Sequence, residues 1–223
     1  MQISYLALII IVMVLGFGAQ ALIRATYNKW NKVKLSAGPS GAEAARKMLD
    51  AHGLSQVSVT QVEGTLSDHF DPRTNVVSLS SEVYQSRSVA AVAVACHECG
   101  HAVQTAHQYM PARIRSAIVP VVSVASNLWV IVLLAGIFLS MLNLIYIAIA
   151  MFAAVLVFQI VTLPVEFDAS RRALAFIRTS GWLAPSENTG AARVLRAAAL
   201  TYVAAALASL LQLLYFIGAF GRR

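Results

Sequence analysis

Charged residues are scarce in this sequence and are missing from three long stretches. They make up 12% of the chain, whereas about 25% is usual in a soluble domain. Residues 3 to 23, 117 to 163 and 197 to 220 contain no Asp, Glu, Lys or Arg. Such runs exclude an ordinary soluble protein and predict helices that span a membrane.

The middle stretch is too long for one span. At about 1.5 Å per residue, residues 117 to 163 would extend roughly 70 Å as a single helix, across a hydrocarbon core about 30 Å thick. We therefore expect two helices with a turn near Ser140 to Asn143. The chain then divides into five predicted parts: an anchor at 1–23, a polar region at 24–116, a transmembrane hairpin at 117–163, a polar loop or helix at 164–196, and a last transmembrane helix at 197–223.

The first stretch has an alternative interpretation as a secretory signal peptide. Ala19-Gln20-Ala21 imitates a signal-peptidase cleavage site. However, residues 1 to 5 contain no Lys or Arg, and the apolar run is longer than a usual secretory core. An uncleaved membrane anchor is the better interpretation.

Acidic residues are fewer than basic ones, and the basic residues are unevenly placed. The chain has 17 Lys and Arg against 10 Asp and Glu, a net charge of +7. Most of the basic residues lie in the regions 24–116 and 164–196, which predicts that both regions face the cytoplasm. This orientation places the C-terminus outside the cell, so only Arg222 and Arg223 disagree with it. Membrane topology therefore explains the positive charge, and no nucleic-acid partner is expected.

The sequence has only two cysteines, Cys96 and Cys99. A structural disulfide is not expected between thiols in the reducing cytoplasm. The CxxC spacing is also found in redox and metal sites. Because free Cys is among the most buried residue types, we expect two small core residues.

The polar region 24–116 contains both helix and strand patterns. A short helix is predicted at 42–51, strands around 57–61 and 75–80, and one buried Ala- and Val-rich helix at 88–107. The predicted fold is therefore a mostly α membrane protein, with four transmembrane helices and a small α+β cytoplasmic region.

The buried helix contains the motif HExxH, as His97, Glu98 and His101. Two histidines four residues apart lie about 40° apart around a helix, so both rings can bind one metal ion. The adjacent Glu can take a proton from water whose pKa zinc lowers toward about 7. A chance match is disfavoured, because charge buried in an apolar helix is costly unless a metal compensates it. We expect one Zn²⁺ ion per chain.

A catalytic zinc ion usually has three protein ligands, and two residues compete to be the third. Glu166 directly follows the third span, and the hairpin 117–163 returns it to the side of the membrane that the chain left. It could instead pair with neighbouring arginines. His107 has the offset of the third His in HExxHxxGxxH, but Gln104 replaces the Gly, so an unbroken helix would turn His107 away from the ion. We favour Glu166.

Two features ahead of the zinc helix concern the substrate. His69, in a turn-rich loop, could stabilise an oxyanion, although a solvated loop His is the more usual role. The strand at 75–80 could hold an extended peptide by β-augmentation, if its edge is exposed beside the zinc helix.

Four segments resemble the YugP-like membrane zinc metallopeptidases of bacteria. They are DHFDPRT at 68–74, HECGHAVQ at 97–104, LPVEFDASRR at 163–172 and AAALTYVAA at 197–205. Together they are more specific than HExxH alone, and they cover nearly the whole chain. This family is similar in plan to the heat-shock membrane protease HtpX and the CAAX prenyl proteases, which are gluzincins.

The resemblance implies a neutral zinc metallopeptidase with a zincin-like catalytic region. It implies roles for four residues: zinc ligation by His97, His101 and Glu166, and general base catalysis by Glu98. Many gluzincins carry an Asp four residues after the ligand Glu, to orient a zinc-bound His. Here Ser170 occupies that place, and Asp168 would face elsewhere on a helix.

The predicted function is zinc-dependent hydrolysis of peptide bonds in membrane-associated or misfolded proteins, by a multi-pass enzyme of the cell membrane. One alternative is an intramembrane site-two-type protease with 88–107 as a span, but such proteases usually add an Asp-Gly motif, which this chain lacks. The other is a non-enzymatic zinc-binding membrane protein or transporter. A transporter should have ionisable residues within its spans, and the hairpin has no Asp, Glu, Lys or Arg.

Overall fold

A computed structural model describes residues 4–65 and 67–221 of the chain. The outermost residues of the first and last predicted spans, including Arg222 and Arg223, lie outside these ranges. The described residues form seven helices and three strands.

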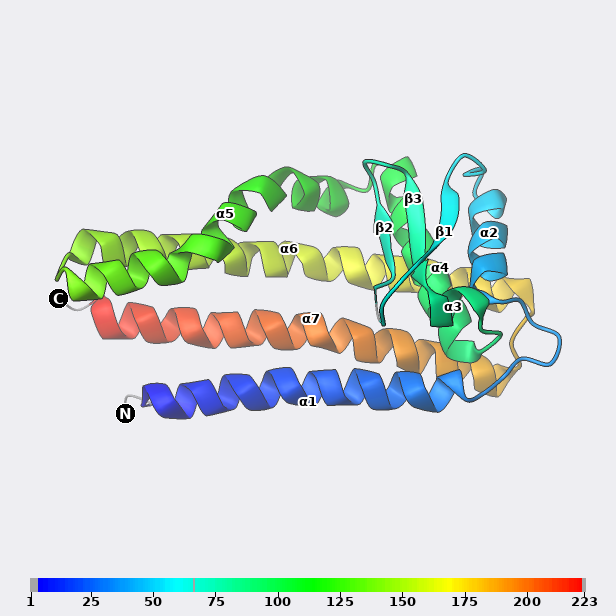
Figure 1. The fold of residues 1–223 in the computed structure, drawn as a ribbon, viewed down its shortest axis with the longest axis horizontal. Coiled ribbons are helices and arrows are strands. Elements are labelled where there is room, and N and C mark those ends of the chain that lie inside the picture. The colour runs from blue at the N-terminus through cyan, green and yellow to red at the C-terminus, as the bar shows by residue number, and fades with distance from the viewer. Residues whose placement is uncertain (1–3, 66, 222–223) are drawn as a thin grey trace.

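Four long helices match the four predicted spans. They are α1 (Tyr5–Asn31), α5 (Met110–Phe138), α6 (Leu142–Ser180) and α7 (Pro185–Phe220). Each is long and apolar enough to cross a membrane, and they form one elongated bundle (Figure 1). The first part of α5 bends away from α6 (Figure 1), and Pro120 inside this helix removes a backbone hydrogen bond. The predicted fold class, a mostly helical membrane protein, is confirmed.

The helices continue well beyond the apolar stretches. The chain reverses between α5 and α6 at residues 139–141, close to the turn expected near Ser140 to Asn143. α6 then runs through Pro164 without interruption, and only four residues separate it from α7. The polar part 164–196 is therefore almost wholly helical, and it extends two of the spans into the region of the HExxH helix.

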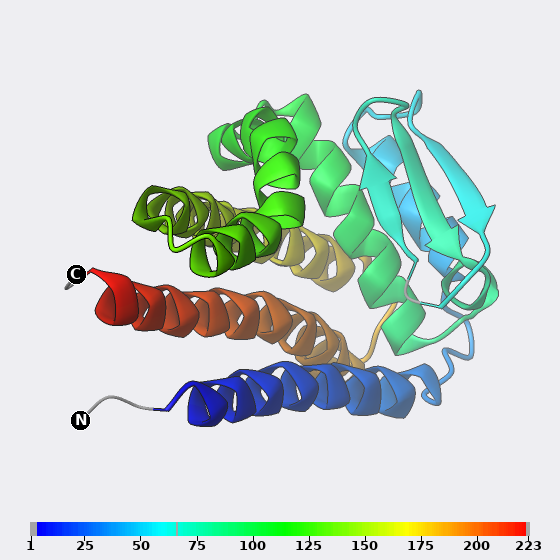
Figure 2. The same cartoon turned by 60° about the vertical axis from the view of Figure 1, so that its left-hand side comes forward.

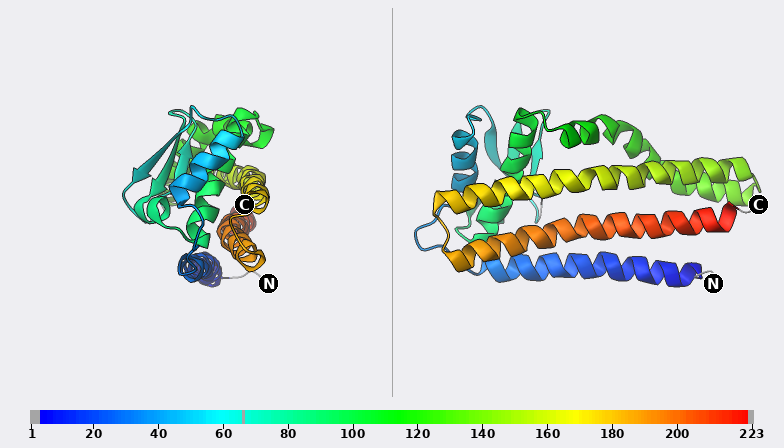
Figure 3. Two further views of the ribbon diagram at one scale, coloured as in Figure 1. Left: turned by 90° about the vertical axis from the view of Figure 1, so that its right-hand side faces the viewer. Right: turned by 180° about the vertical axis from the view of Figure 1, so that it is seen from behind.

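The polar region forms a small α+β unit at one end of the bundle (Figure 3). Its elements are α2 (Gly41–Ala51), β1 (Ser58–Val62), β2 (His69–Asp71), β3 (Val76–Ser80), α3 (Ser81–Gln85) and α4 (Val89–Ala106). The sheet has the order β1-β3-β2, with β1 parallel and β2 antiparallel to β3. α2 and α4 pack on each other and against the sheet (Figure 2).

The strand predicted at 75–80 is the central strand of this sheet, so the expectation that it offers an exposed edge is wrong. β3 has β1 on one side and β2 on the other. The sequence does not predict β2, because its three residues are too few to show an alternation of polar and apolar side chains. The edge strand that contacts α4 is β2.

α4 is the central helix of the α+β unit and is largely buried. Cys96 and Cys99 are fully buried free thiols, as expected of small core residues. Burial raises the pKa of both thiols. At Gly100 the backbone of α4 approaches α6 so closely that an added Cβ would lie 2.6 Å from the carbonyl oxygen of Ala169. The small side chains of α4 thus allow a close contact between these two helices.

Gly100→Ala should destabilise the protein, because its methyl group would collide with backbone atoms of Ala169 rather than with a flexible side chain. Overpacking of this kind costs about 1–3 kcal/mol. We expect a lower thermal unfolding temperature for the purified protein in detergent. Gly18→Ala is the matched control, since a Cβ at Gly18 would meet nothing within 4 Å. Equal unfolding temperatures for the two variants would contradict the close helix contact.

Candidate metal centre

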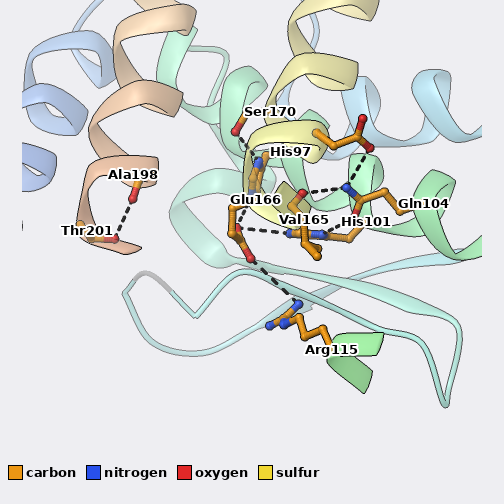
Figure 4. Close-up of polar contacts among 10 residues, drawn as sticks. His97, His101, Gln104, Arg115, Val165, Glu166, Ser170, Ala198 and Thr201 are labelled. Carbon is orange, nitrogen blue, oxygen red and sulfur yellow. Dashed lines mark hydrogen bonds and ion pairs between the residues drawn. The ribbon is translucent and has the colours of Figure 1, made fainter. Parts of the chain in front are cut away.

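The structure brings the side chains of His97, His101 and Glu166 together (Figure 4). Their ligand atoms all lie within 4.8 Å of one another. Glu166 Oε2 is 3.3 Å from His97 Nε2 and 3.7 Å from His101 Nε2. The two rings come from successive turns of α4, and the carboxylate comes from α6. Among the described residues, these three form the group suited to a metal ion.

Burial makes this cluster favourable for a cation. Glu166 is only 3% exposed, and a buried carboxylate without compensation costs several kcal/mol. Burial alone would lower the pKa of His101, but its close contact with the Glu166 carboxylate and the negative charge of Glu98 outweigh that effect and raise it. Two imidazole nitrogens and one carboxylate oxygen are donors that zinc prefers, and the three side chains line a cavity that has room for water.

Each histidine ring is oriented by a second side chain. Ser170 Oγ lies 3.1 Å from His97 Nδ1, and Gln104 Oε1 lies 3.1 Å from His101 Nδ1. The amide nitrogen of Gln104 donates to the Val165 carbonyl at 2.7 Å, so its oxygen must face the ring. His101 Nδ1 therefore carries the proton, which leaves Nε2 free to bind a metal ion.

Ser170 and Asp168 make different contacts near the candidate ligands. Ser170 does contact a candidate ligand, as the place of Asp in many gluzincins would suggest. Asp168 does not touch either histidine, but it accepts a hydrogen bond from Gln104 Nε2 at 3.0 Å and pairs with Arg171 and Arg172. Asp168 therefore lies outside the cluster, and Gln104 connects it to His101. In the sequence, the comparison with HExxHxxGxxH indicates only that Gln104 stands in the place of a Gly, and it does not predict this contact.

Glu98 is buried beside the cluster and lines the same cavity as the three candidate ligands. A second cavity, between α1, α4 and α7, also reaches Glu98. Asp68 borders both cavities. Burial raises the pKa of the Asp68 carboxyl, and the charge of Glu98 acts in the same direction, against the hydrogen bonds from Ser80. Two further carboxylates, those of Glu98 and Asp68, therefore line the cavity of the candidate ligands.

Of the two other candidate histidines, His69 lines the cavity, whereas His107 lies outside the cluster. His69 is on β2, at the cavity wall, and its Nδ1 is 2.8 Å from the Ser67 carbonyl oxygen, so a local hydrogen bond does fix its ring. His107 is the exposed residue that ends α4. The helix continues unbroken to Ala106, and His107 does not join the cluster.

Two further residues line the cavity without a role predicted from the sequence. Arg115, from α5, places Nη1 4.0 Å from Glu166 Oε1, and its Nε is buried with no hydrogen-bond partner among the described residues. Tyr202, from α7, lines the cavity with it. Both side chains can donate hydrogen bonds to a molecule bound there. They reach the site only through the packing of distant helices.

The comparisons with known proteins agree with this geometry. A family model described as "Putative neutral zinc metallopeptidase" matches residues 5–221. The "Putative membrane protease YugP" of Bacillus subtilis (strain 168) is 48% identical over 203 residues, which cover 91% of this chain and 90% of that protein. No solved structure matches the chain.

Gln104→Leu should weaken metal binding, because it removes the acceptor that orients His101 and leaves Asp168 without its amide partner. Loss of such an outer partner typically lowers metal affinity about 10–100-fold. Zinc affinity of the purified variants, measured by competition with a chelator, checks this. Gln56→Leu, at an exposed position away from the site, should bind zinc like the unmodified protein. Equal affinities for both variants would remove Gln104 from the ligand support.

Proposed function

The chain belongs to the family of neutral zinc metallopeptidases, and we propose that it is an endopeptidase with one zinc ion held by His97, His101 and Glu166 and with Glu98 as general base. The observation that supports this most directly is the convergence of three ligand atoms within 4.8 Å, beside a carboxylate that lines the same cavity. The membrane character of the enzyme rests on its four candidate spans and its similarity to a membrane protease.

Zinc bound in this site would supply Lewis acidity toward the scissile carbonyl and would acidify a water molecule. The protein contributes the rest of the proposed chemistry. Glu98 accepts a proton from water and returns it to the leaving amine. Ser170 and Gln104 hold the histidine rings in place, so that the ligand geometry is fixed before the substrate arrives. Arg115 and Tyr202 can donate to the substrate carbonyl from the cavity wall.

Polypeptides are the substrates that a metallopeptidase implies, and β2 offers a place for one. His69 and Phe70 of this strand line the cavity, and β2 is at the edge of the described sheet. A peptide that paired with this edge would be extended as it passed the candidate ligands. Only unfolded or loosely held segments can adopt that form, so we propose membrane-associated or misfolded chains as substrates.

We also propose that the site faces the cytoplasm. The α+β unit and the connection between α6 and α7 lie at the same end of the bundle, whereas α1 begins and α7 ends at the opposite end (Figure 1). These two polar regions carry most of the basic residues, and basic loops stay on the cytoplasmic side of a membrane.

A site-two-type arrangement, with HExxH inside a span, is not supported by the fold. α4 is not among the helices of the described chain that are long and apolar enough to cross a membrane. It packs against α2 and the sheet on one side and against the polar-end parts of α6 and α7 on the other. The proposed site therefore lies where the α+β unit meets the polar end of α6.

His97→Ala, His101→Ala and Glu166→Ala should each lose most of the bound zinc, since each removes one of three protein ligands. His107→Ala is the matched control and should retain about one zinc ion per chain, because His107 lies outside the cluster. Metal content of the purified variants decides this. Zinc lost in His107→Ala but retained in Glu166→Ala would overturn the proposed ligand set.

Glu98→Gln should keep the zinc ion but lose hydrolysis, because an amide cannot accept the proton from water. The loss of a general base typically lowers the rate about 10²–10⁴-fold. Peptide hydrolysis and metal content are measured on the same preparation, so that metal loss is not mistaken for a catalytic defect. Hydrolysis at the unmodified rate would exclude Glu98 as the base.

Reporters inserted at Gly64 and at Gly181, both in the connections of the polar end, should map to the cytoplasm. A reporter at Ser140, in the turn between α5 and α6, should map to the outer side. Accessibility of single cysteines to a membrane-impermeant reagent gives a second measure. If the reporters at Gly64 and Gly181 mapped to opposite sides, a shared metal site would be impossible.

A further inference from the structure

A groove lies between α1 and α7, near the polar end of the bundle. Its lining shares no residue with the two cavities that reach Glu98. The two helices run antiparallel and side by side (Figures 1 and 3), and they contact each other along much of their length. The groove is therefore a separate feature of the membrane-facing part of the protein.

The walls of the groove change from apolar to basic in one direction. Toward the middle of the spans, Leu22 and Leu200 line it, with exposed fractions of 46% and 47%. Toward the polar end, the lining residues are Lys29, Arg193 and Arg196. Because α1 and α7 are antiparallel, the apolar lining residues of the two helices lie at the same level, and so do their basic lining residues. The groove is thus apolar where a phospholipid would place its acyl chain and basic where it would place its phosphate headgroup.

The basic half of the groove has no acidic partner. No carboxylate lines it, and within residues 4–65 and 67–221 the structure shows no ion pair for Lys29, Arg193 or Arg196. Arg171 and Arg172, by contrast, are both paired with Asp168. Arginine binds phosphate through two parallel hydrogen bonds. Three unpaired cations, two of them arginines, are therefore suited to an anionic phosphate group.

Trp30 closes one side of the groove. Its ring packs so tightly on α7 that a Cβ at Gly190 would lie 2.3 Å from ring atom Cε3. Lys29 Nζ is 5.8 Å from the ring centroid. Tryptophan favours the level of lipid headgroups in membrane proteins, so its position agrees with the chemistry of the walls.

We propose that this groove binds an anionic phospholipid, with the phosphate at Lys29, Arg193 and Arg196 and an acyl chain along Leu22 and Leu200. The apolar half distinguishes this ligand from free phosphate, and the unpaired cations distinguish it from a zwitterionic lipid. The bound lipid would join α1 to α7, the helix that also carries Tyr202 into the metal cavity. The proposal does not depend on the peptidase assignment.

Fluorescence quenching by lipids with brominated acyl chains tests the site, because Trp30 lines the groove. The full chain in neutral detergent is titrated with phosphatidylglycerol and with phosphatidylcholine carrying the same chains, and Trp30→Phe identifies the Trp30 signal. We expect phosphatidylglycerol to bind at least about tenfold more tightly, and Arg193→Gln/Arg196→Gln to abolish that preference. The thermal unfolding temperature of this variant in detergent should stay unchanged, which shows that it is folded.

Arg24→Gln/Lys32→Gln is the matched control, since it removes two charges from the same polar end but from outside the groove lining. It should keep the preference for phosphatidylglycerol. Equal affinity for both lipids, or the same loss in the control as in the arginine variant, would overturn the proposal. If the arginine double variant fails to fold, Arg193→Gln and Arg196→Gln alone should each reduce the preference. Displacement of the lipid by millimolar inorganic phosphate or by an acidic peptide would also contradict a lipid site.

Discussion

The close contact between α4 and α6 determines where the candidate ligands lie. The two backbones meet at Gly100 and Ala169. His97 and His101 lie on either side of Gly100 along α4, and Glu166 lies about one turn before Ala169 on α6. A helix carrying HExxH can present two nitrogens alone, but the third ligand must come from a neighbour at short range. The missing side chain at position 100 allows that neighbour to approach.

Four acidic side chains lie at or near this contact, and the protein compensates their negative charge in different ways. Asp168 has two arginine partners and the amide of Gln104. Asp68 accepts hydrogen bonds from Ser80. Glu166 has the two histidine rings and a distant contact with Arg115, and Glu98 lies beside it in the same cavity. A divalent cation at the histidines would compensate the last two carboxylates together, which explains why they are tolerated in a buried position.

Local patterns predicted the parts of this structure that depend on local physics. Apolar runs predicted the four long helices, because burial in a bilayer requires composition rather than a particular partner. Helical spacing predicted that His97 and His101 meet and that His107 turns away. Glu166 followed from counting how often the chain crosses the membrane. The order of the sheet did not follow, because β2 is too short to show a pattern. Arg115 and Tyr202 reach the site through tertiary packing that no spacing encodes, whereas Gln104 lies three residues after His101 on α4, a spacing that allows their contact.

The candidate metal centre lies near the level at which the apolar spans begin, and this constrains the way a substrate can arrive. Glu166 stands three residues after Leu163, the last residue of the charge-free hairpin. Tyr202 lies six residues beyond Arg196 on α7, which places it roughly 9 Å farther along the span. One wall of the cavity thus extends into the apolar part of α7, whereas Arg193 and Arg196 on that helix border the proposed lipid groove. If the proposed spans cross the bilayer, a chain that reaches the cavity would pass close to the membrane surface, which is consistent with the proposed membrane-associated substrates.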